Sequence, residues 1–298
     1  MLDLRFLARR KALSAIAVLT MALALGANTA VLSVLKAFLL SGLAVPESDR
    51  VVLIAPERDL PGRGTVIFSE AYANYKLLRE TQRAFADVTA FLQIQASWDD
   101  DGEARPLNAT RATASFFSTM RVQPARGRAF TASEEGPSPA PVAIISHGLW
   151  TSAFGADPAI VGSTISLNGS AHTVIGVMPG GSAQPVPSDV WLPFDIPAAQ
   201  RTAITGGRQL TVYGRIADGK SFELARADVD RFSARAIEAH PADNKDYRYN
   251  IKTLRDGLLN GADESALFVQ AGAATLLVLA ILNLASVPVA WGFERSRR

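Results

Sequence analysis

Two long uncharged apolar segments lie near the ends of the chain, one at each end. The first covers residues 12–40 and is interrupted only by Lys36, while the second covers residues 265–293. As helices rising about 1.5 Å per residue, residues 12–35 and 265–293 would reach about 36 and 43 Å. Both lengths exceed the ~30 Å thickness of a bilayer's hydrocarbon core. The pattern therefore predicts two transmembrane helices.

Basic residues flank both segments on the side of the chain terminus. Because Lys and Arg near a span are retained in the cytoplasm, both termini are predicted to be cytoplasmic, as residues 1–11 and 294–298. Residues 41–264 would then form one extracytoplasmic domain of an inner (plasma) membrane protein. The flanking basic residues are Arg5, Arg9, Arg10, Lys11, Arg295, Arg297 and Arg298.

A cleaved signal peptide is the alternative interpretation of the first segment, with small residues at positions 28–30 as the cleavage site. Apolar residues continue after Ala30, which favours a retained span. The second segment contains Gln270 and Asn283. Polar groups inside a span usually face another helix, so we expect a partner in the membrane.

Between the two segments, the first half of the domain alternates apolar and polar residues with the period of a strand. Residues 51–54 predict a short buried strand, residues 69–79 a helix, and residues 88–98 a long strand with strict alternation. The run Asp-Asp-Asp-Gly at 99–102 then predicts a hairpin turn, which we favour over a calcium site because no further ligand spacing follows. A second strand covers 105–111.

The second half repeats this order. Residues 210–216 predict a strand, Asp218 and Gly219 a turn, and Ser221 the cap of a helix. That helix has one apolar face, formed by Phe222, Ala225, Val229, Phe232 and Ala236, and a strand follows at 249–254. Two strand–helix–strand units thus bracket a middle section at about 105–199. We predict an α+β fold of two lobes, in which the middle section is an inserted lobe.

Composition excludes several classes of function. The net charge is only +2 and is concentrated at the membrane flanks, which gives no indication of nucleic-acid binding. Cysteine is absent from the 298 residues, so disulfides and thiol-ligated metals are excluded.

Residues 214–221 match the P-loop pattern G-x-x-x-x-G-K-[ST]. Because Gly214 falls inside an alternating strand, we favour a strand, a turn and a capped helix over a nucleotide site. Ser146 and His147 are adjacent and would point in opposite directions on an extended chain, so they form no nucleophile–base pair. His147, His172 and His240 show no metal-ligand spacing. We therefore predict no catalytic, cofactor-binding or metal-binding residues and no enzyme activity.

The middle section contains a series of short motifs at 124–131, 141–150, 154–158, 161–162, 167–169, 174–179 and 189–193. Taken in this order, they strongly resemble the MacB-like periplasmic core domain of FtsX-like ABC transporter permeases, in particular the group of duplicated orphan permeases. Residues 17–30 are similar to the first transmembrane helix of the same proteins.

The resemblance implies a porter-like lobe, an inserted second lobe and a mechanical role without catalytic residues. It implies as partners a cytoplasmic ABC ATPase and further permease helices or a second permease copy, within the lipid bilayer. A periplasmic adaptor or an outer-membrane channel is a further implied partner. The resemblance supplies no cofactor and no transported substrate.

Two features depart from the family pattern. Members continue after their second helix into a coupling helix and more spans, whereas this sequence stops at 294–298, so we expect a split or truncated permease. Arg121 also stands before Val122, where a small residue is expected.

The main alternative is a two-span membrane sensor or scaffold whose exterior domain binds a ligand or a protein. An exported enzyme ranks third, since no catalytic constellation is present.

The predicted topology can be tested with protease on intact spheroplasts. Residues 41–264 should be digested while tags on both termini survive. Protection of the domain until the membrane is permeabilised would contradict the topology.

Overall fold

The computed structural model describes residues 45–259 apart from 101, 182–186, 196 and 205, together with isolated positions at 19, 21, 22, 25, 26, 29, 30, 271, 272, 275 and 278. Leu43–Leu258 form one compact unit. Among the described residues, no helix is both long and apolar enough to cross a membrane. The spans predicted at 12–40 and 265–293 lie outside the described residues, apart from those isolated positions.

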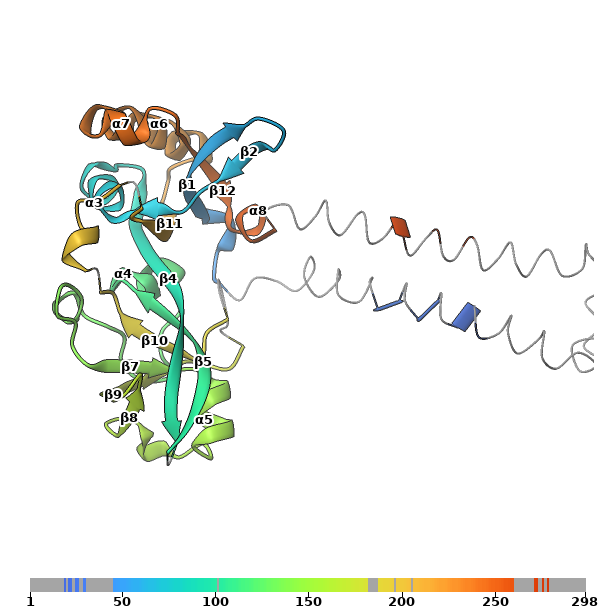
Figure 1. Cartoon of the computed structure of the whole chain (residues 1–298), viewed down its shortest axis with the longest axis vertical. Helices are drawn as coiled ribbons and strands as arrows, with labels where there is room; N and C mark the ends of the chain where they lie inside the picture. Colours follow the sequence, from blue (N-terminus) through green and yellow to red (C-terminus); the bar gives the residue numbers. More distant parts are fainter. Residues whose placement is uncertain are drawn as a thin grey trace, which may run out of the picture. The chain divides into compact units, whose positions relative to one another are not determined.

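A mixed sheet runs through the whole unit in the order β12-β1-β11-β4-β5-β10-β7-β9-β6, with β2, β3 and β8 attached at its sides (Figure 1). Most neighbours are antiparallel, but β5 with β10 and β7 with β9 are parallel. The strands are β1 (Val51–Leu60), β2 (Gly64–Ile67), β3 (Glu70–Ala71), β4 (Phe85–Asp100), β5 (Glu103–Ala112), β6 (Arg126–Gly127), β7 (Val142–Ile145), β8 (Thr164–Leu167), β9 (Ser170–Val177), β10 (Val190–Pro193), β11 (Arg208–Ile216) and β12 (Arg248–Thr253).

The helices are short apart from α6. They are α3 (Tyr72–Thr81), α4 (Ser115–Met120), α5 (His147–Ala153), α6 (Phe222–Ala239), α7 (Pro241–Asn244) and α8 (Leu254–Leu259), with 3-10 turns η1 (Ser48–Arg50), η2 (Ala132–Glu134), η3 (Pro158–Ile160) and η4 (Ala198–Gln200).

The β4–β5 hairpin is the longest pairing in the sheet, and it confirms the predicted alternation and turn. β4 pairs with β5 from Phe91–Ala112 to Asp100–Glu103. Gly102 takes φ 88°, which an L-residue rarely adopts. Its N–H donates to Asp99 Oδ1 at 2.8 Å, so this carboxylate serves the turn. Figure 1 shows β4 running from the part of the domain around α3 to the part around α5.

Helices α3 and α6 pack on the sheet, as the apolar periodicity predicts. Ser221 Oγ accepts the Leu224 N–H at 3.3 Å and caps α6. The buried face of α6 consists of Ala225, Val229, Phe232 and Ala236, with Phe222 half-buried. They share one core with residues of β1, β4, β11 and β12, so the early and late strand–helix–strand units form a single layer pair.

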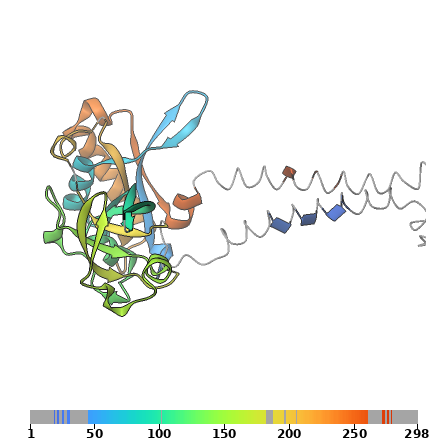
Figure 2. The same ribbon diagram turned by 60° about the horizontal axis from the view of Figure 1, so that its bottom comes forward.

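Two predicted elements have different bounds in the structure. The strand predicted at 51–54 continues to Leu60 and turns into β2, and Figure 2 shows this hairpin projecting from the body of the domain. The helix predicted at 69–79 begins at Tyr72, because Glu70 and Ala71 pair with β11 first. The inserted lobe at 105–199 stays a prediction.

The P-loop match is an ordinary strand and turn. Gly214 pairs with Val52 of β1 and Val88 of β4 in the centre of the sheet. A Cβ on Gly214 would lie 2.6 Å from Phe85 Cδ1 and 3.0 Å from Ile54 Cδ1. The glycine therefore serves close packing between strands.

The substitution Gly214→Ala should destabilise the domain by about 1–3 kcal/mol, because the added methyl group overpacks this core. Thermal unfolding of the full chain, followed by tryptophan fluorescence, measures the effect. The matched control is Gly148→Ala in α5, where the nearest atom would be Ser146 Oγ at 3.7 Å, and where alanine favours the helix. Equal melting temperatures for the two variants would contradict this packing role.

Candidate functional site

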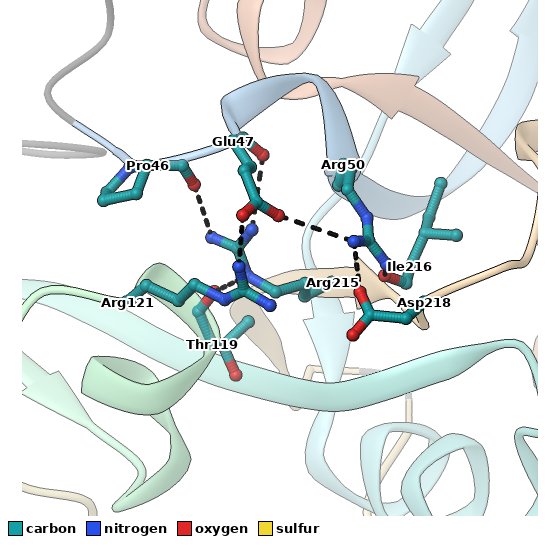
Figure 3. Close-up of polar contacts among 8 residues, drawn as sticks. All are labelled: Pro46, Glu47, Arg50, Thr119, Arg121, Arg215, Ile216 and Asp218. Carbon is teal, nitrogen blue, oxygen red and sulfur yellow. Dashed lines mark hydrogen bonds and ion pairs between the residues drawn. The ribbon is translucent and has the colours of Figure 1, made fainter.

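The short segment that leads from the predicted first span into the sheet is held by a cluster of arginines. We call residues 45–50 the connecting segment; it includes η1 and precedes β1. Figure 3 shows it lying over α4, β11 and the turn between β11 and α6. The contacts of this segment that are described below involve Arg50, Arg121 and Arg215, or the apolar core.

Arg215 of β11 forms the centre of the cluster. Its side chain is buried, with a residue exposure of 2%. Nε donates to the Thr119 carbonyl at 2.6 Å, while Nη2 donates to Pro46 O at 3.0 Å and Nη1 to Glu47 O at 3.3 Å. One guanidinium thus ties β11, the end of α4 and the connecting segment together through main-chain atoms.

Two further arginines hold the Glu47 side chain. Arg121 Nη1 lies 2.5 Å from Glu47 Oε1, and Arg50 Nη1 lies 3.4 Å from Oε2. Arg50 also pairs with Asp218 and donates to the Ile216 carbonyl at 2.6 Å. These ion pairs lie at the surface, where each alone contributes little to stability. Their main role is to fix the position of the connecting segment.

Glu47 and Arg121 both have left-handed backbone conformations, with φ of 48° and 51°. Arg121 ends α4, where its N–H donates to the Ser118 carbonyl. This position normally takes Gly or Asn, which explains why a small residue was expected there. The turn forms with arginine instead, and the side chain reaches Glu47.

The charged groups of the cluster shift one another's pKa values. Burial lowers the pKa of Arg215, and the nearby positive charge of Arg121 lowers it further, while Glu47 opposes both effects. The hydrogen bond to Arg50 lowers the pKa of the exposed Asp218 carboxyl. Among the described residues, no carboxylate pairs with Arg215 directly. The cost of burying its charge is offset by the three carbonyl groups that accept its hydrogen bonds.

An apolar core lies beneath the cluster and receives both ends of the domain. Val45 of the connecting segment and Leu254 of α8 are buried in the same hydrophobic cluster as Leu53. A Cβ on Gly257 of α8 would lie 3.0 Å from Leu53 Cβ, so α8 packs directly on β1. The two points at which the chain enters and leaves this unit are therefore fixed to one core.

The serine and histidine residues that the sequence analysis considered for catalysis or metal binding have local structural roles. Ser146 Oγ accepts the Leu149 N–H and caps α5. His147 lies edge-on to Trp150, His172 Nδ1 lies 2.9 Å from the Ser170 carbonyl, and His240 ends α6. Within the described part of the chain, no three His, Cys, Asp or Glu side chains are grouped to hold a metal ion.

A second polar cluster, which the sequence did not indicate, lies inside the domain. The carboxylate of Glu70 accepts hydrogen bonds from Arg208 and Asn74, both at 3.1 Å. Burial raises the pKa of Glu70 and that of Tyr249, whose hydroxyl accepts a hydrogen bond from Asn74 Nδ2 at 2.8 Å. Because its polar atoms satisfy one another, this cluster locks α3 to β11 and β12.

Replacing Arg215 with Met should destabilise the domain by about 2–4 kcal/mol, since three carbonyl groups lose their buried donor. The control is Arg226→Met on the exposed side of α6, which removes the same atoms from the surface and should change stability by less than about 0.5 kcal/mol. Both are measured by thermal unfolding of the full chain. A loss for Arg215→Met no larger than the control's would show that the cluster does not hold the segment.

Two solved structures with a similar fold are a domain of a permease protein and a periplasmic region. A domain assigned to a permease protein of Porphyromonas gingivalis has a TM-score of 0.52 at 16% identity, with 70% of this chain and 91% of that one covered. The periplasmic region of MacB from Actinobacillus actinomycetemcomitans has a TM-score of 0.52 at 14% identity, with coverages of 72% and 94%. At these identities the likeness is one of fold.

The family follows from the sequence itself. No protein with a curated description matches the chain. The family model described as the MacB-like periplasmic core domain matches residues 14–232, which is well over half of the chain's 298 residues. The chain therefore belongs to the family of proteins with a MacB-like periplasmic core domain.

Proposed function

We propose that this chain is a non-catalytic permease subunit or fragment of a MacB-type ABC transporter, in which the arginine cluster passes helix motion to the extracytoplasmic domain. The observation that carries the proposal is the anchoring of Pro46 and Glu47 by the buried Arg215. The role requires a firm mechanical connection and no reactive side chain.

The contacts of Arg215 define the route that motion would take. The segment it holds follows the predicted span at 12–40 after about five residues, a reach of about 17 Å at full extension. β11, which carries Arg215, pairs with both β1 and β4. A displacement of the connecting segment would therefore act on the centre of the sheet, and close-packed interiors transmit strain.

The C-terminal end of the domain, at α8, supports the same route for the motion. Leu254 and Gly257 fix α8 to the core beneath β1, and α8 precedes the predicted span at 265–293. Two helices moving relative to one another would load β1 from both ends of the domain. In this proposal both termini are cytoplasmic, residues 41–264 are extracytoplasmic, and the lobe at 105–199 moves relative to the porter-like units.

The proposed partners follow from the family and from the predicted spans. ATP hydrolysis would come from a cytoplasmic ABC ATPase, and further permease helices or a second permease copy would cover Gln270 and Asn283. A periplasmic adaptor or an outer-membrane channel would receive the motion. Export and mechanotransmission both use this arrangement.

Co-purification tests the proposal. A tagged full chain, solubilised from its native membrane, should bring down an ABC ATPase and a multi-span permease protein. The variant Asn283→Leu should recover less of the multi-span protein, because the polar contact between helices is removed, while a Gln209→Leu control at an exposed position of β11 should recover the wild-type amount. Purification of the chain alone, with specific binding of a small ligand, would favour a two-span sensor or scaffold instead.

A further inference from the structure

The central strand β4 changes partner along one of its edges, and a stretch between the two partners is open. β5 occupies one edge from Phe91 to Asp100. On the opposite edge, β11 pairs with β4 as far as Phe91, and β8 pairs only with Trp98 and Asp99. Among the described residues, no strand pairs with positions 92–97 on this edge.

Backbone groups of Gln93 and Gln95 point into the open stretch. Ser97 marks the direction, because its N–H donates to Asn168 Oδ1 at 2.8 Å and its carbonyl accepts from Asn168 N at 2.7 Å. Since backbone groups alternate between the two edges of a strand, Gln95 and Gln93 face the same way as Ser97.

The partner strand gives the same direction independently. Asn108 of β5 lies opposite Gln95, yet its N–H and carbonyl bond with Asp189, on the side away from β4. Gln95 and Asn108 are thus a pair without mutual hydrogen bonds, so the N–H and carbonyl of Gln95 point away from β5. An unpaired edge of this kind is a template for another strand.

A surface groove lies at one end of the open stretch. Its volume is about 220 Å³, and its lining includes Leu92, the first residue of the open stretch, together with Arg111, Asp195, Gln200 and Gln209.

Side chains along the edge indicate what fits there. Leu92 and Ile94 are only half-buried, on the face that packs against the core, whereas Gln93 and Gln95 are exposed on the other face. The charged pair of the groove, Arg111 and Asp195, lies 3.4 Å apart and cancels. The site is neutral and rich in amides, which favours an uncharged peptide over an anion or a nucleic acid.

We propose that residues 92–96 of β4 bind an extended, uncharged segment of a partner polypeptide as an added β-strand. Its main chain would hydrogen-bond to Gln93 and Gln95, and its apolar side chains would cover Leu92 and Ile94. This interaction surface is independent of the proposed transport role, since it requires neither an ATPase nor the arginine cluster.

The probe is the peptide acetyl-Thr-Val-Thr-Val-Thr-amide, added to the full chain in lipid nanodiscs. Two derivatives are N-methylated at alternate residues, one set at the Thr amides and the other at the Val amides. Because only one set can face β4, one derivative should bind like the parent and the other at least about tenfold more weakly. Equal affinities for the three peptides, or no binding of the parent, would overturn the proposal.

Hydrogen exchange and one pair of variants locate the site. The parent peptide should slow exchange at the Gln93 and Gln95 amides by about tenfold. Gln93→Pro removes the N–H that faces the open stretch without removing a bond to β5, and should weaken binding about tenfold, whereas Gln93→Ala should not. Binding unchanged in Gln93→Pro would overturn the proposal, as would self-association of the chain that Gln93→Pro abolishes, which would assign the edge to a second copy.

Discussion

The domain depends on one buried guanidinium that is bonded to three main-chain oxygens in two separate segments, the end of α4 and the connecting segment. Arg215 is anchored in the middle of the sheet, and it holds the connecting segment through the carbonyls of Pro46 and Glu47. A charged group in such a position is costly to bury unless every donor finds an acceptor. The geometry of the segment is therefore specified closely, since a displaced carbonyl would leave part of the charge uncompensated.

A second constraint is the continuity of the sheet. β4 joins the layer that carries α3 and α6 to the strands around α5, and it does so by exchanging β11 for β8 along one edge. Close approach of main chains supports the far side, where a Cβ on Gly127 would lie 2.0 Å from the Ile175 carbonyl. Because β11 pairs with β4 only as far as Phe91 and β8 only at Trp98 and Asp99, backbone groups of Gln93 and Gln95 have no strand partner among the described residues.

Much of this fold could be predicted from the order of apolar and polar residues. The alternation along 88–98, the turn at 99–102 and the capped helix after Ser221 are local signals, and the structure confirms them. The family resemblance is also confirmed. Local periodicity could not show that Glu70 pairs with β11 before α3 begins, because that pairing joins residues about 140 positions apart.

The arginine cluster lay beyond sequence reasoning for the same reason. Glu47, Arg121 and Arg215 are far apart in the sequence, and an arginine in a strand gives no indication of which carbonyls it will meet. One signal was present: Arg121 stood out as unusual beside Val122, and it proves to be a left-handed residue that reaches Glu47. An unexpected residue at a turn was thus the best available indicator of the site.

Two left-handed residues form an ion pair at the junction between the connecting segment and the end of α4. A non-glycine backbone at φ near 50° is held at a cost of about 1–3 kcal/mol, and it persists only where its surroundings impose it. Glu47 and Arg121 bear this cost on the two sides of one ion pair. Separating Glu47 from Arg121 would remove a contact between the two turns, so each turn would lose part of what holds its left-handed residue.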